Sequence, residues 1–370
     1  MKTARTIESG IREGRLSAQC SVLSRMMPKL STEHLALSTW LLCLLIVLSP
    51  TRGLRGADLR FGGAIPHEVE TIYERGLAWM AARQNDEGSW QGGNDGPGVN
   101  GICVMAFLAS GEDPNFGKYA RNVRRGVRAI LKSQQESGYF PHSMYHHGFA
   151  MLALSEAYGA VDEALLWEGE KPVRTISQAL DLAIRLSGTS QKNNRWGGWR
   201  YSPEARDADT SVTGAMLMGL LAARNAGMEV SDEVLEAALE YMRRSTSKDG
   251  SVAYSGGFGG MGESMNRSAI ATLVAAVAKK KDTEEYKATL EHINTRLDHQ
   301  EGHYKEYFRY YMAQALFQGD YESWQKWNTA TVRTLSETQG EDGSFGDAYQ
   351  TGMSLLAVAL NYRFLPIYER

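Results

Sequence analysis

The stretch Gln84-Asn-Asp-Glu-Gly-Ser-Trp90 (QNDEGSW) follows a run with the spacing of a helix. Its pattern is a glutamine, three residues, a glycine, one residue and an aromatic, and it returns at Gln134 to Phe140 and at Gln339 to Phe345. A signature that recurs after about 50 residues indicates that one supersecondary unit has been copied along the chain. The sequence therefore predicts an architecture of repeated units.

Two further copies of this motif are altered. Gln191 leads to Gly198 and Trp199 through a longer insert, and Thr246 stands in the place of the glutamine before Gly250. We expect the motif to be structural, because a glycine after the last turn can adopt the left-handed conformation that ends a helix. The aromatic residue would then cover the helix end, and the glutamine amide would bond backbone groups of the turn.

Two kinds of helix alternate between the motifs. Amphipathic segments, each with one polar face, are predicted as outer helices at residues 68–84, 118–134, 172–190, 232–245, 284–297 and 321–338. Segments that are apolar nearly all round are predicted as buried inner helices at residues 148–154, 214–223, 269–278 and 352–360. Two concentric layers satisfy this alternation, and six pairs close a ring. We therefore predict one all-α domain, an (α/α)6 toroid, over residues 65–366.

The composition fits a globular protein with an exported precursor. The 370 residues are 43% hydrophobic and 22% charged with a net charge of -3, which gives no basic surface for nucleic acid. Residues 35–48 carry no charge and precede Pro50, so residues 1–57 are predicted to be a signal peptide with an over-extended start, with an uncleaved membrane anchor as the alternative. Cys103 is then the single cysteine of the mature chain, where we expect a small buried apolar residue.

Three segments carry a resemblance to a known family. Gln84-Asn-Asp-Glu-Gly-Ser-Trp90, Gly197-Gly-Trp-Arg-Tyr201 and Asp209-Thr-Ser-Val-Thr-Gly214 resemble the repeats of the prenyltransferase and squalene cyclase superfamily, over roughly residues 65–366. The chain looks most similar to secreted bacterial proteins with a single toroid and prenyltransferase and squalene oxidase repeats. The resemblance implies a central cavity that holds an isoprenoid. It also implies an acidic proton donor, as in triterpene cyclases, or a zinc ion, as in protein prenyltransferase β subunits.

Asp207 and Asp209 are the candidate catalytic residues, because they arrive just before an inner helix. A proton-donating acid must be neutral, and burial beside a second carboxylate raises its pKa. The match to the Asp-x-Asp-Asp motif of the cyclases is incomplete, since either Thr210 or Ala208 replaces an acidic position. Asp209 followed by Thr210 and Ser211 is also typical of a helix N-cap.

Aromatic and histidine residues near the starts of inner helices are candidates for a cavity wall that stabilises carbocations or packs an apolar ligand. The predicted cavity residues are Tyr145, His146, His147, Trp196, Trp199, Tyr201, Tyr307, Tyr310 and Tyr311. Neighbouring histidines on a helix point about 100° apart, so His146 and His147 do not predict a metal site. We expect no metal and no cofactor. The glycine-rich stretch 255–262 lacks the lysine of a phosphate loop and is expected to be a loop at the cavity rim.

The leading hypothesis is an exported toroid whose central apolar cavity binds an isoprenoid or another apolar small molecule, with turnover left open. Membrane contact is expected only through the leader or the substrate. Two alternatives stay open. One is a non-catalytic binding or scaffold protein of the envelope that contacts proteins or glycans through its rim. The other is a glycan-processing toroid, which needs paired carboxylates such as Asp209 with Glu263 or Asp347.

Overall fold

The computed structural model describes residues 65–91, 95–167, 169–255 and 264–368. The chain divides into two compact units, and all the described residues belong to the second, residues 55–370. The predicted leader at residues 1–57 and most of the glycine-rich stretch 255–262 lie outside the described residues. Within the described part there is no β-strand, and the non-helical pairing consists of two isolated bridges, Asp209 with Ser255 and Thr246 with Val252. The prediction of an all-α domain is confirmed.

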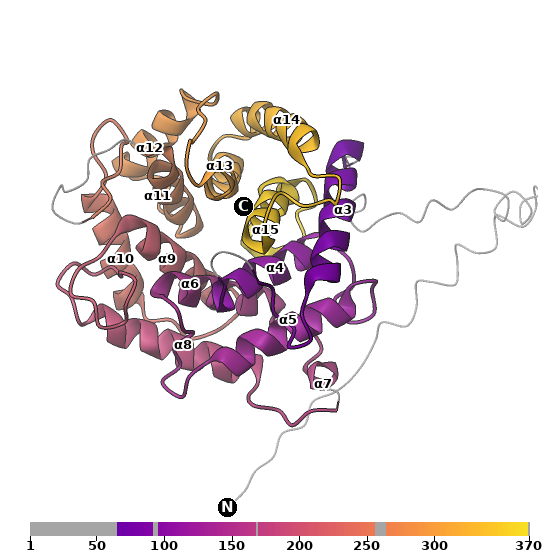
Figure 1. Cartoon of the computed structure of the whole chain (residues 1–370). Coiled ribbons are helices and arrows are strands. Elements are labelled where there is room, and N and C mark those ends of the chain that lie inside the picture. The colour runs from indigo at the N-terminus through magenta and orange to yellow at the C-terminus, as the bar shows by residue number, and fades with distance from the viewer. Residues whose placement is uncertain (1–64, 92–94, 168, 256–263, 369–370) are drawn as a thin grey trace, which may run out of the picture. The chain divides into compact units, whose positions relative to one another are not determined.

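Outer and inner helices alternate along the chain (Figure 1). The outer helices are α3 (His67–Arg83), α5 (Ala120–Ser133), α8 (Ile176–Gln191), α10 (Asp232–Arg244), α12 (Glu284–Asn294) and α14 (Tyr321–Thr338). The inner helices are α4 (Pro97–Ala109), α6 (Met144–Ala157), α9 (Thr210–Asn225), α11 (Met265–Val277), α13 (Lys305–Gly319) and α15 (Ala348–Val358). A short helix, α7 (Glu163–Leu166), lies between α6 and α8 and was not predicted from the sequence.

The inner helices form a closed ring. Each packs against the next in the order α4, α6, α9, α11, α13 and α15, and α15 returns to α4. In the outer layer, the last helix α14 contacts the first helix α3, so the two ends of the chain's helical layers meet (Figure 1). Inner helices are buried nearly all round, as α4 shows along its whole length, whereas outer helices such as α10 bury one stripe. The (α/α)6 toroid predicted from the alternation of helix types is therefore confirmed.

The glutamine motif joins each repeat to the next. Gln84 Nε2 donates both to the carbonyl of Gly88 in its own turn and to the carbonyl of Asn122 on α5, each at 2.9 Å. Gln134 makes the same pair of bonds, to its own turn and to Ala179 on α8. The outer helix ends at the glutamine itself, so the glycine does not end the helix as expected. Gly88 does have a left-handed φ of 91°, and a Cβ there would lie 2.3 Å from the carbonyl oxygen of Arg125 on the next outer helix.

The last copy of the motif closes the ring. Gln339 Nε2 donates to Gly343 O at 2.8 Å and to Ile72 O at 3.0 Å, and Ile72 lies on the first outer helix. The altered copy at Gln191 keeps both bonds, one to Gly197 O in its own turn and one to Val234 O on α10. The first and last repeats are thus joined by the same contact that joins neighbours within the chain.

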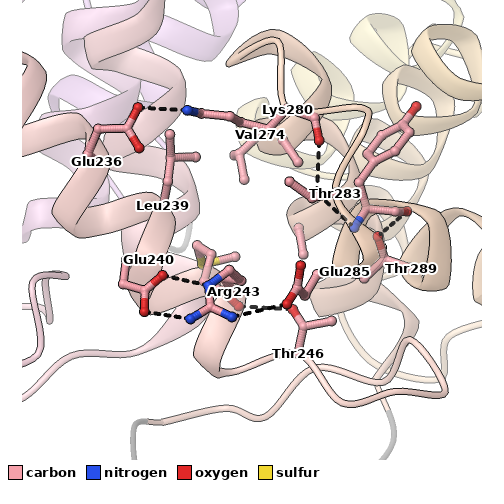
Figure 2. Close-up of a pocket in the computed structure, with 14 residues that line it drawn as sticks. Glu236, Leu239, Glu240, Arg243, Thr246, Val274, Lys280, Thr283, Glu285 and Thr289 are labelled. Atoms are coloured by element: carbon pink, nitrogen blue, oxygen red, sulfur yellow. Dashed lines mark hydrogen bonds and ion pairs between the residues drawn. The ribbon is translucent and has the colours of Figure 1, made fainter.

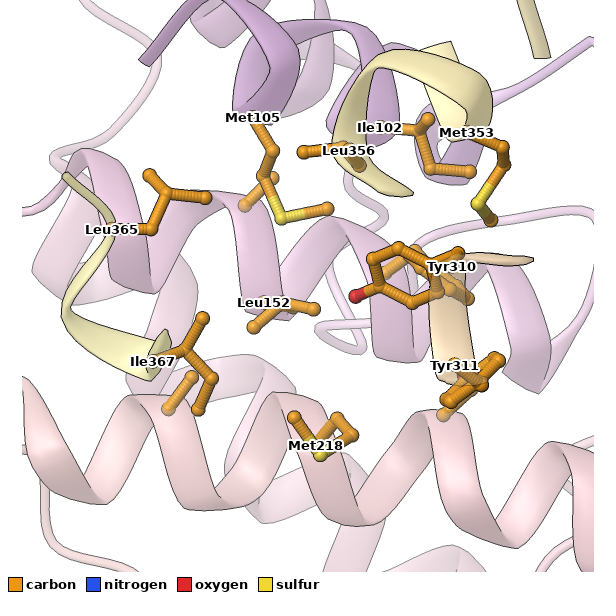
Figure 3. Close-up of a cluster of buried hydrophobic side chains, with 14 of the residues drawn as sticks. Ile102, Met105, Leu152, Met218, Tyr310, Tyr311, Met353, Leu356, Leu365 and Ile367 are labelled. Atoms are coloured by element: carbon orange, nitrogen blue, oxygen red, sulfur yellow. The ribbon is translucent and has the colours of Figure 1, made fainter. Parts of the chain in front are cut away.

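The far end of the ring, where the inner helices end, is filled by side chains. After α15, the 3-10 turns Ala359–Asn361 and Pro366–Tyr368 carry the chain inward, and the second turn contacts α9. Leu365 and Ile367 are buried in a cluster with Leu152 and Met218 from the inner ring (Figure 3). The ring is therefore packed at this end by the chain's own C-terminal segment. Cys103 is fully buried in the core, as predicted.

Candidate functional site

The central cavity opens at the end of the ring where all the inner helices begin. Its volume is about 530 Å³, which lies within the range of small-molecule sites, about 300–1,000 Å³. Every inner helix contributes to its lining from its first turns or from the residues just before them. The lining residues are Gly98, Val99, Ile102, Ser143, Tyr145, His146, Tyr201, Ser211, Tyr254, Ser264, Asn266, Arg267, Tyr304, Tyr307 and Tyr349.

Tyrosine is the commonest residue type in the cavity wall. The rings of Tyr145 and Tyr307 lie 5.9 Å apart between centroids, and the hydroxyls of Tyr201 and Tyr254 are 3.3 Å apart. Burial raises the pKa of Tyr145 and of Tyr307 well above the usual value for tyrosine, so both hydroxyls are neutral at any physiological pH. The wall thus offers aromatic faces together with neutral groups that both donate and accept hydrogen bonds.

Several buried polar atoms at this wall are incompletely hydrogen-bonded. Asn266 Oδ1 has no partner among the described residues. The hydroxyls of Tyr145, Tyr307 and Tyr311 make no well-formed hydrogen bond there and interact only with one another, with Ser211 beside Tyr307 and Tyr349 beside Tyr145. Leaving a buried donor or acceptor unsatisfied costs about 1–3 kcal/mol, and native proteins contain few of them. Because these atoms are not fully satisfied, a polar group that enters the cavity can form hydrogen bonds with them.

The charges at the cavity favour an electron-rich ligand. Arg267 is partly buried; burial lowers the pKa of its guanidinium, and the charge of Glu301 raises it, but an arginine stays charged. Its Nε donates to Val252 O at 2.8 Å, which fixes the side chain at the cavity. The six inner helices present their N-termini here, where the helix dipole is positive. No aspartate or glutamate belongs to the lining formed by the described residues.

His146 lines the cavity as a neutral residue. Burial lowers the pKa of its imidazole to about 4, with a smaller contribution from the neighbouring His142. The backbone N–H of Gly98 donates to His146 Nδ1 at 3.3 Å. The remaining ring nitrogen, Nε2, then carries the proton and is a donor at neutral pH. His142 itself has a left-handed φ of 80°, which is uncommon for a residue other than glycine.

The two predicted catalytic aspartates are in different surroundings. Asp207 is 59% exposed and pairs with Arg200 at 3.0 Å. Asp209 is fully buried and caps α9, since its Oδ1 accepts from the N–H of Val212 at 2.8 Å. Burial raises the pKa of Asp209 to about 6, while the Val212 N–H and Arg200, 3.8 Å away, oppose the rise. Asp209 is not among the lining residues, and its Oδ2 has no hydrogen-bond partner among the described residues.

His147 and Trp199, both predicted at the cavity, are buried between the inner and outer layers instead. The N–H of Phe140 donates to His147 Nδ1 at 3.1 Å, and His147 Nε2 lies 3.2 Å from Ala183 O. Burial lowers the pKa of His147 to about 4, so the ring is neutral and its Nδ1 can accept the hydrogen bond from Phe140. Trp199 is 1% exposed and its indole donates to Ser187 O at 3.0 Å. His147 therefore links α6 to α8, and Trp199 links the segment before α9 to α8.

His147 occupies a position that recurs in the repeat. The N–H of the motif aromatic donates to a polar side chain on the following inner helix in each case, from Trp90 to Asn100, from Trp199 to Thr213 and from Phe345 to Thr351. His147 is the equivalent acceptor in the second repeat. Its location is therefore explained by the architecture.

The remaining predicted residues divide between the cavity and the core. Tyr145, His146, Tyr201 and Tyr307 line the cavity. Tyr310 and Tyr311 are buried beneath it in the cluster of Figure 3, and Trp196 lies in the turn before α9 under the guanidinium of Arg195. The sequence analysis missed Arg267, Asn266, Tyr254, Tyr304 and Tyr349. These five residues have one feature in common: each lies in the segment before an inner helix or in its first turn.

A second hollow, of about 200 Å³, lies on the outer wall between α10 and α12 (Figure 2). Leu239 and Val274 form part of its apolar floor. Its charged rim groups pair with one another, Lys280 with Glu236 at 2.8 Å and Arg243 with both Glu240 and Glu285. Because these charged side chains already pair with one another, we interpret the hollow as the junction between two outer helices and not as a binding site.

Neither a metal centre nor a membrane span is found in the described part of the chain. Across residues 65–91, 95–167, 169–255 and 264–368, no three histidine, cysteine or acidic side chains gather in a way that would hold an ion. None of the helices there has both the length and the apolar character to cross a bilayer.

Comparison with known proteins supports the fold and leaves the activity open. No family model and no curated protein matches this sequence. Among solved structures, a variant of the α-1,6-mannanase GH76A of Salegentibacter sp. HEL1_6 in complex with α-1,6-mannotetraose is similar (TM-score 0.60, 9% identity, 79% of this chain and 99% of that one). So are a type II terpene cyclase from Scytonema in complex with geranylgeranyl dihydroxybenzoate (0.54, 12%, 80% and 98%) and a D-mannose isomerase (0.54, 11%, 81% and 99%). At these identities the likeness shows the toroid fold alone.

Proposed function

We propose that this toroid binds a polyhydroxylated ligand, a carbohydrate segment, in its central cavity. The observation that carries the proposal is the set of buried, incompletely hydrogen-bonded polar atoms at an aromatic wall, Tyr145 Oη, Tyr307 Oη and Asn266 Oδ1. A hydrocarbon placed there would leave Asn266 Oδ1 without a partner, at a cost of about 1–3 kcal/mol, and would offer the two hydroxyls nothing beyond their contacts with each other, Ser211 and Tyr349. A sugar supplies hydroxyls to these atoms and presents its C–H faces to the tyrosine rings.

The proposal is for binding and not for hydrolysis. Glycoside hydrolysis needs two carboxylates roughly 5–9.5 Å apart on either side of the scissile bond. Of the predicted pairs, Asp209 and Asp347 cap α9 and α15, and Glu263 lies outside the described residues. The mannanase and mannose isomerase folds are consistent with a sugar ligand in this type of ring, and they do not extend their chemistry to this chain.

An isoprenoid with an oxygen-rich head group is the second candidate. It is favoured by the deep part of the cavity, where Val99 and Ile102 are buried beside the rings of Tyr145 and Tyr307, and Phe149 packs behind Tyr145 with centroids 5.0 Å apart. The terpene cyclase shares the toroid, and the sequence resembles that superfamily. Arg267 at the cavity would suit an anionic head group.

Removing single hydroxyl groups separates the two candidates. Tyr145→Phe and Tyr307→Phe keep the rings and each remove one hydroxyl, so the fold should be retained. We expect each change to weaken binding of α-1,6-mannotetraose about fivefold or more, as the loss of one hydrogen bond of about 1 kcal/mol predicts. Binding of geranylgeraniol should be unchanged or tighter. Tyr158→Phe, at an exposed tyrosine that ends α6, is the matched control.

Calorimetric titration of the purified protein gives both affinities, and a glycan array extends the search beyond mannose oligomers. The proposal fails if no glycan binds while geranylgeraniol does, or if the two Tyr→Phe variants bind sugar as well as the Tyr158→Phe control. In the first case the cavity belongs to an isoprenoid, and in the second the sugar binds elsewhere.

A further inference from the structure

A third cavity lies at the opposite end of α4 from the central one. Its volume is about 310 Å³, and it is formed by α3, by the segment 110–119 that follows α4, and by the C-terminal residues 362–364. The lining residues are Ile65, Tyr73, Glu74, Leu77, Ser110, Gly111, Glu112, Asp113, Lys118, Tyr119, Tyr362 and Phe364. We call this cavity the peripheral pocket. Its residues are distinct from those of the central cavity.

Aromatic rings form the inner walls of the peripheral pocket. Tyr73 is 1% exposed and meets Tyr362 edge to face, with ring centroids 4.8 Å apart. Tyr119 is also buried and lies against Phe107, with centroids 5.2 Å apart. Phe364 lies directly over Gly111, where a Cβ would come within 2.0 Å of the ring. These contacts hold the rings in place before any ligand arrives.

The electrostatics of the pocket favour a cation. Three carboxylates, from Glu74, Glu112 and Asp113, line it against a single ammonium group, that of Lys118. The pocket also adjoins the C-terminus of α4, whose last carbonyls carry the negative end of the helix dipole. The central cavity, at the other end of the same helix, receives the positive end.

Two further observations point to a ligand. The hydroxyl of Tyr73 is buried and has no hydrogen-bond partner among the described residues, whereas the hydroxyl of Tyr119 interacts with Lys118. Lys118 Nζ lies over the Tyr119 ring, 4.9 Å from its centroid, so this wall already accepts a positive charge supplied by the chain itself. A cation over a tyrosine face gains about 0.5–1 kcal/mol when exposed and more when it is desolvated.

We propose that the peripheral pocket binds a small alkylammonium ion, whose charge lies between the carboxylates and the tyrosine faces and whose apolar body contacts Leu77 and Phe364. Lys118 acts as an internal competitor for the Tyr119 face. The inference is independent of the ligand of the central cavity, since the two sites share no residue.

Choline is a suitable probe, because 3,3-dimethylbutan-1-ol has the same shape without the charge. Titration of the full-length protein, followed by calorimetry or by tyrosine fluorescence, should show one choline bound with a dissociation constant of about 1 mM or below, and no comparable binding of the neutral alcohol. Equal binding of both compounds, or no binding of choline, would overturn the proposal.

Two sets of variants test the geometry. Glu74→Gln together with Glu112→Gln keeps the shape and should weaken choline binding about fivefold or more. Lys118→Met removes the competing ammonium and should tighten it about two- to fivefold. Lys132→Met is the matched control, because this lysine in the last turn of α5 pairs with Glu170 away from the pocket. The proposal is wrong if Lys118→Met leaves the affinity unchanged or lowers it, or if the double Glu→Gln variant binds like the unmodified protein.

Discussion

Asp209 gives the sharpest prediction, because one buried carboxyl both caps a helix and resists ionisation. In the folded chain its pKa is raised from 3.8 to about 6, chiefly by burial. A shift of about 2 units corresponds to roughly 3 kcal/mol. Because the folded state holds this proton more tightly than the unfolded state does, the free energy of unfolding should fall as the pH rises from about 4 to about 6.

Asp209→Asn should remove this pH dependence and keep the cap. Asparagine has the same acceptor oxygen for the N–H of Val212 and caps helices as well as aspartate does. The variant should match the unmodified protein near pH 3.5, where the aspartate is protonated in both states. At pH 7 it should be more stable, by up to about 3 kcal/mol. Asp209→Ala should lie about 1 kcal/mol below the asparagine variant at every pH, because it loses the cap.

Urea denaturation at a series of pH values between 3.5 and 7.5 measures these differences directly. Asp320→Asn is the control, since Asp320 is also the N-cap of a helix, α14, but is only partly buried. The reasoning is refuted if the difference between Asp209→Asn and the unmodified protein does not change with pH, or if asparagine destabilises the fold at pH 7. The same variants also test the predicted role of Asp209 as a proton donor. Because Asp209 does not line the cavity, we expect both Asp209 variants to bind sugar with the affinity of the unmodified protein.

Three further predictions concern the ring itself. Gly148→Ala should lower the free energy of unfolding by about 1–3 kcal/mol, because the new Cβ would lie 2.7 Å from the backbone of Ala215 on α9. Gly188→Ala is the contrasting case: no atom lies nearer than 3.4 Å to its new Cβ, so this substitution should raise the free energy of unfolding by up to about 1 kcal/mol. Gln134→Ala should cost about 3 kcal/mol in chemical denaturation, because it leaves two carbonyls without their partner, and a loss below 0.5 kcal/mol would contradict the connecting role. Ile367→Ala should cost about 2 kcal/mol and increase hydrogen exchange in α9, and unchanged exchange there would show that the C-terminal segment does not support the ring.

The helices could be predicted from the sequence because their burial is periodic. Five of the predicted outer helices begin within two residues of the observed ones, and α8 begins at Ile176 where residue 172 was expected. The residues before Ile176 include Pro172, and the true start is a capping box at Thr175. The short helix α7 was missed because a single turn is too brief to show a period, and an aspartate cap at Asp162 is its only local signal.

The cavity was harder to predict, because the direction of a side chain depends on contacts distant in sequence. Trp199 and Tyr201 are two residues apart, yet Trp199 is buried by its bond to Ser187 while Tyr201 reaches the cavity. His146 and His147 are likewise adjacent in sequence, yet His146 lines the cavity and His147 is buried between the inner and outer helices. The lining also proved more polar than the predicted apolar cavity, since single serine, asparagine and arginine residues at helix starts carry no periodic signal.

Closure of the ring explains why the site lies where it does. Because Gln339 bonds to the first outer helix as Gln84 and Gln134 bond to the next, the ring has no free end to cap, unlike an open repeat array. Every inner helix then runs in the same direction, so all their first turns meet at one end. The fold thereby fixes a positive, N-terminal mouth for any ligand. Fifteen residues line this mouth, and the α-1,6-mannanase and the type II terpene cyclase illustrate that one toroid fold serves different ligands.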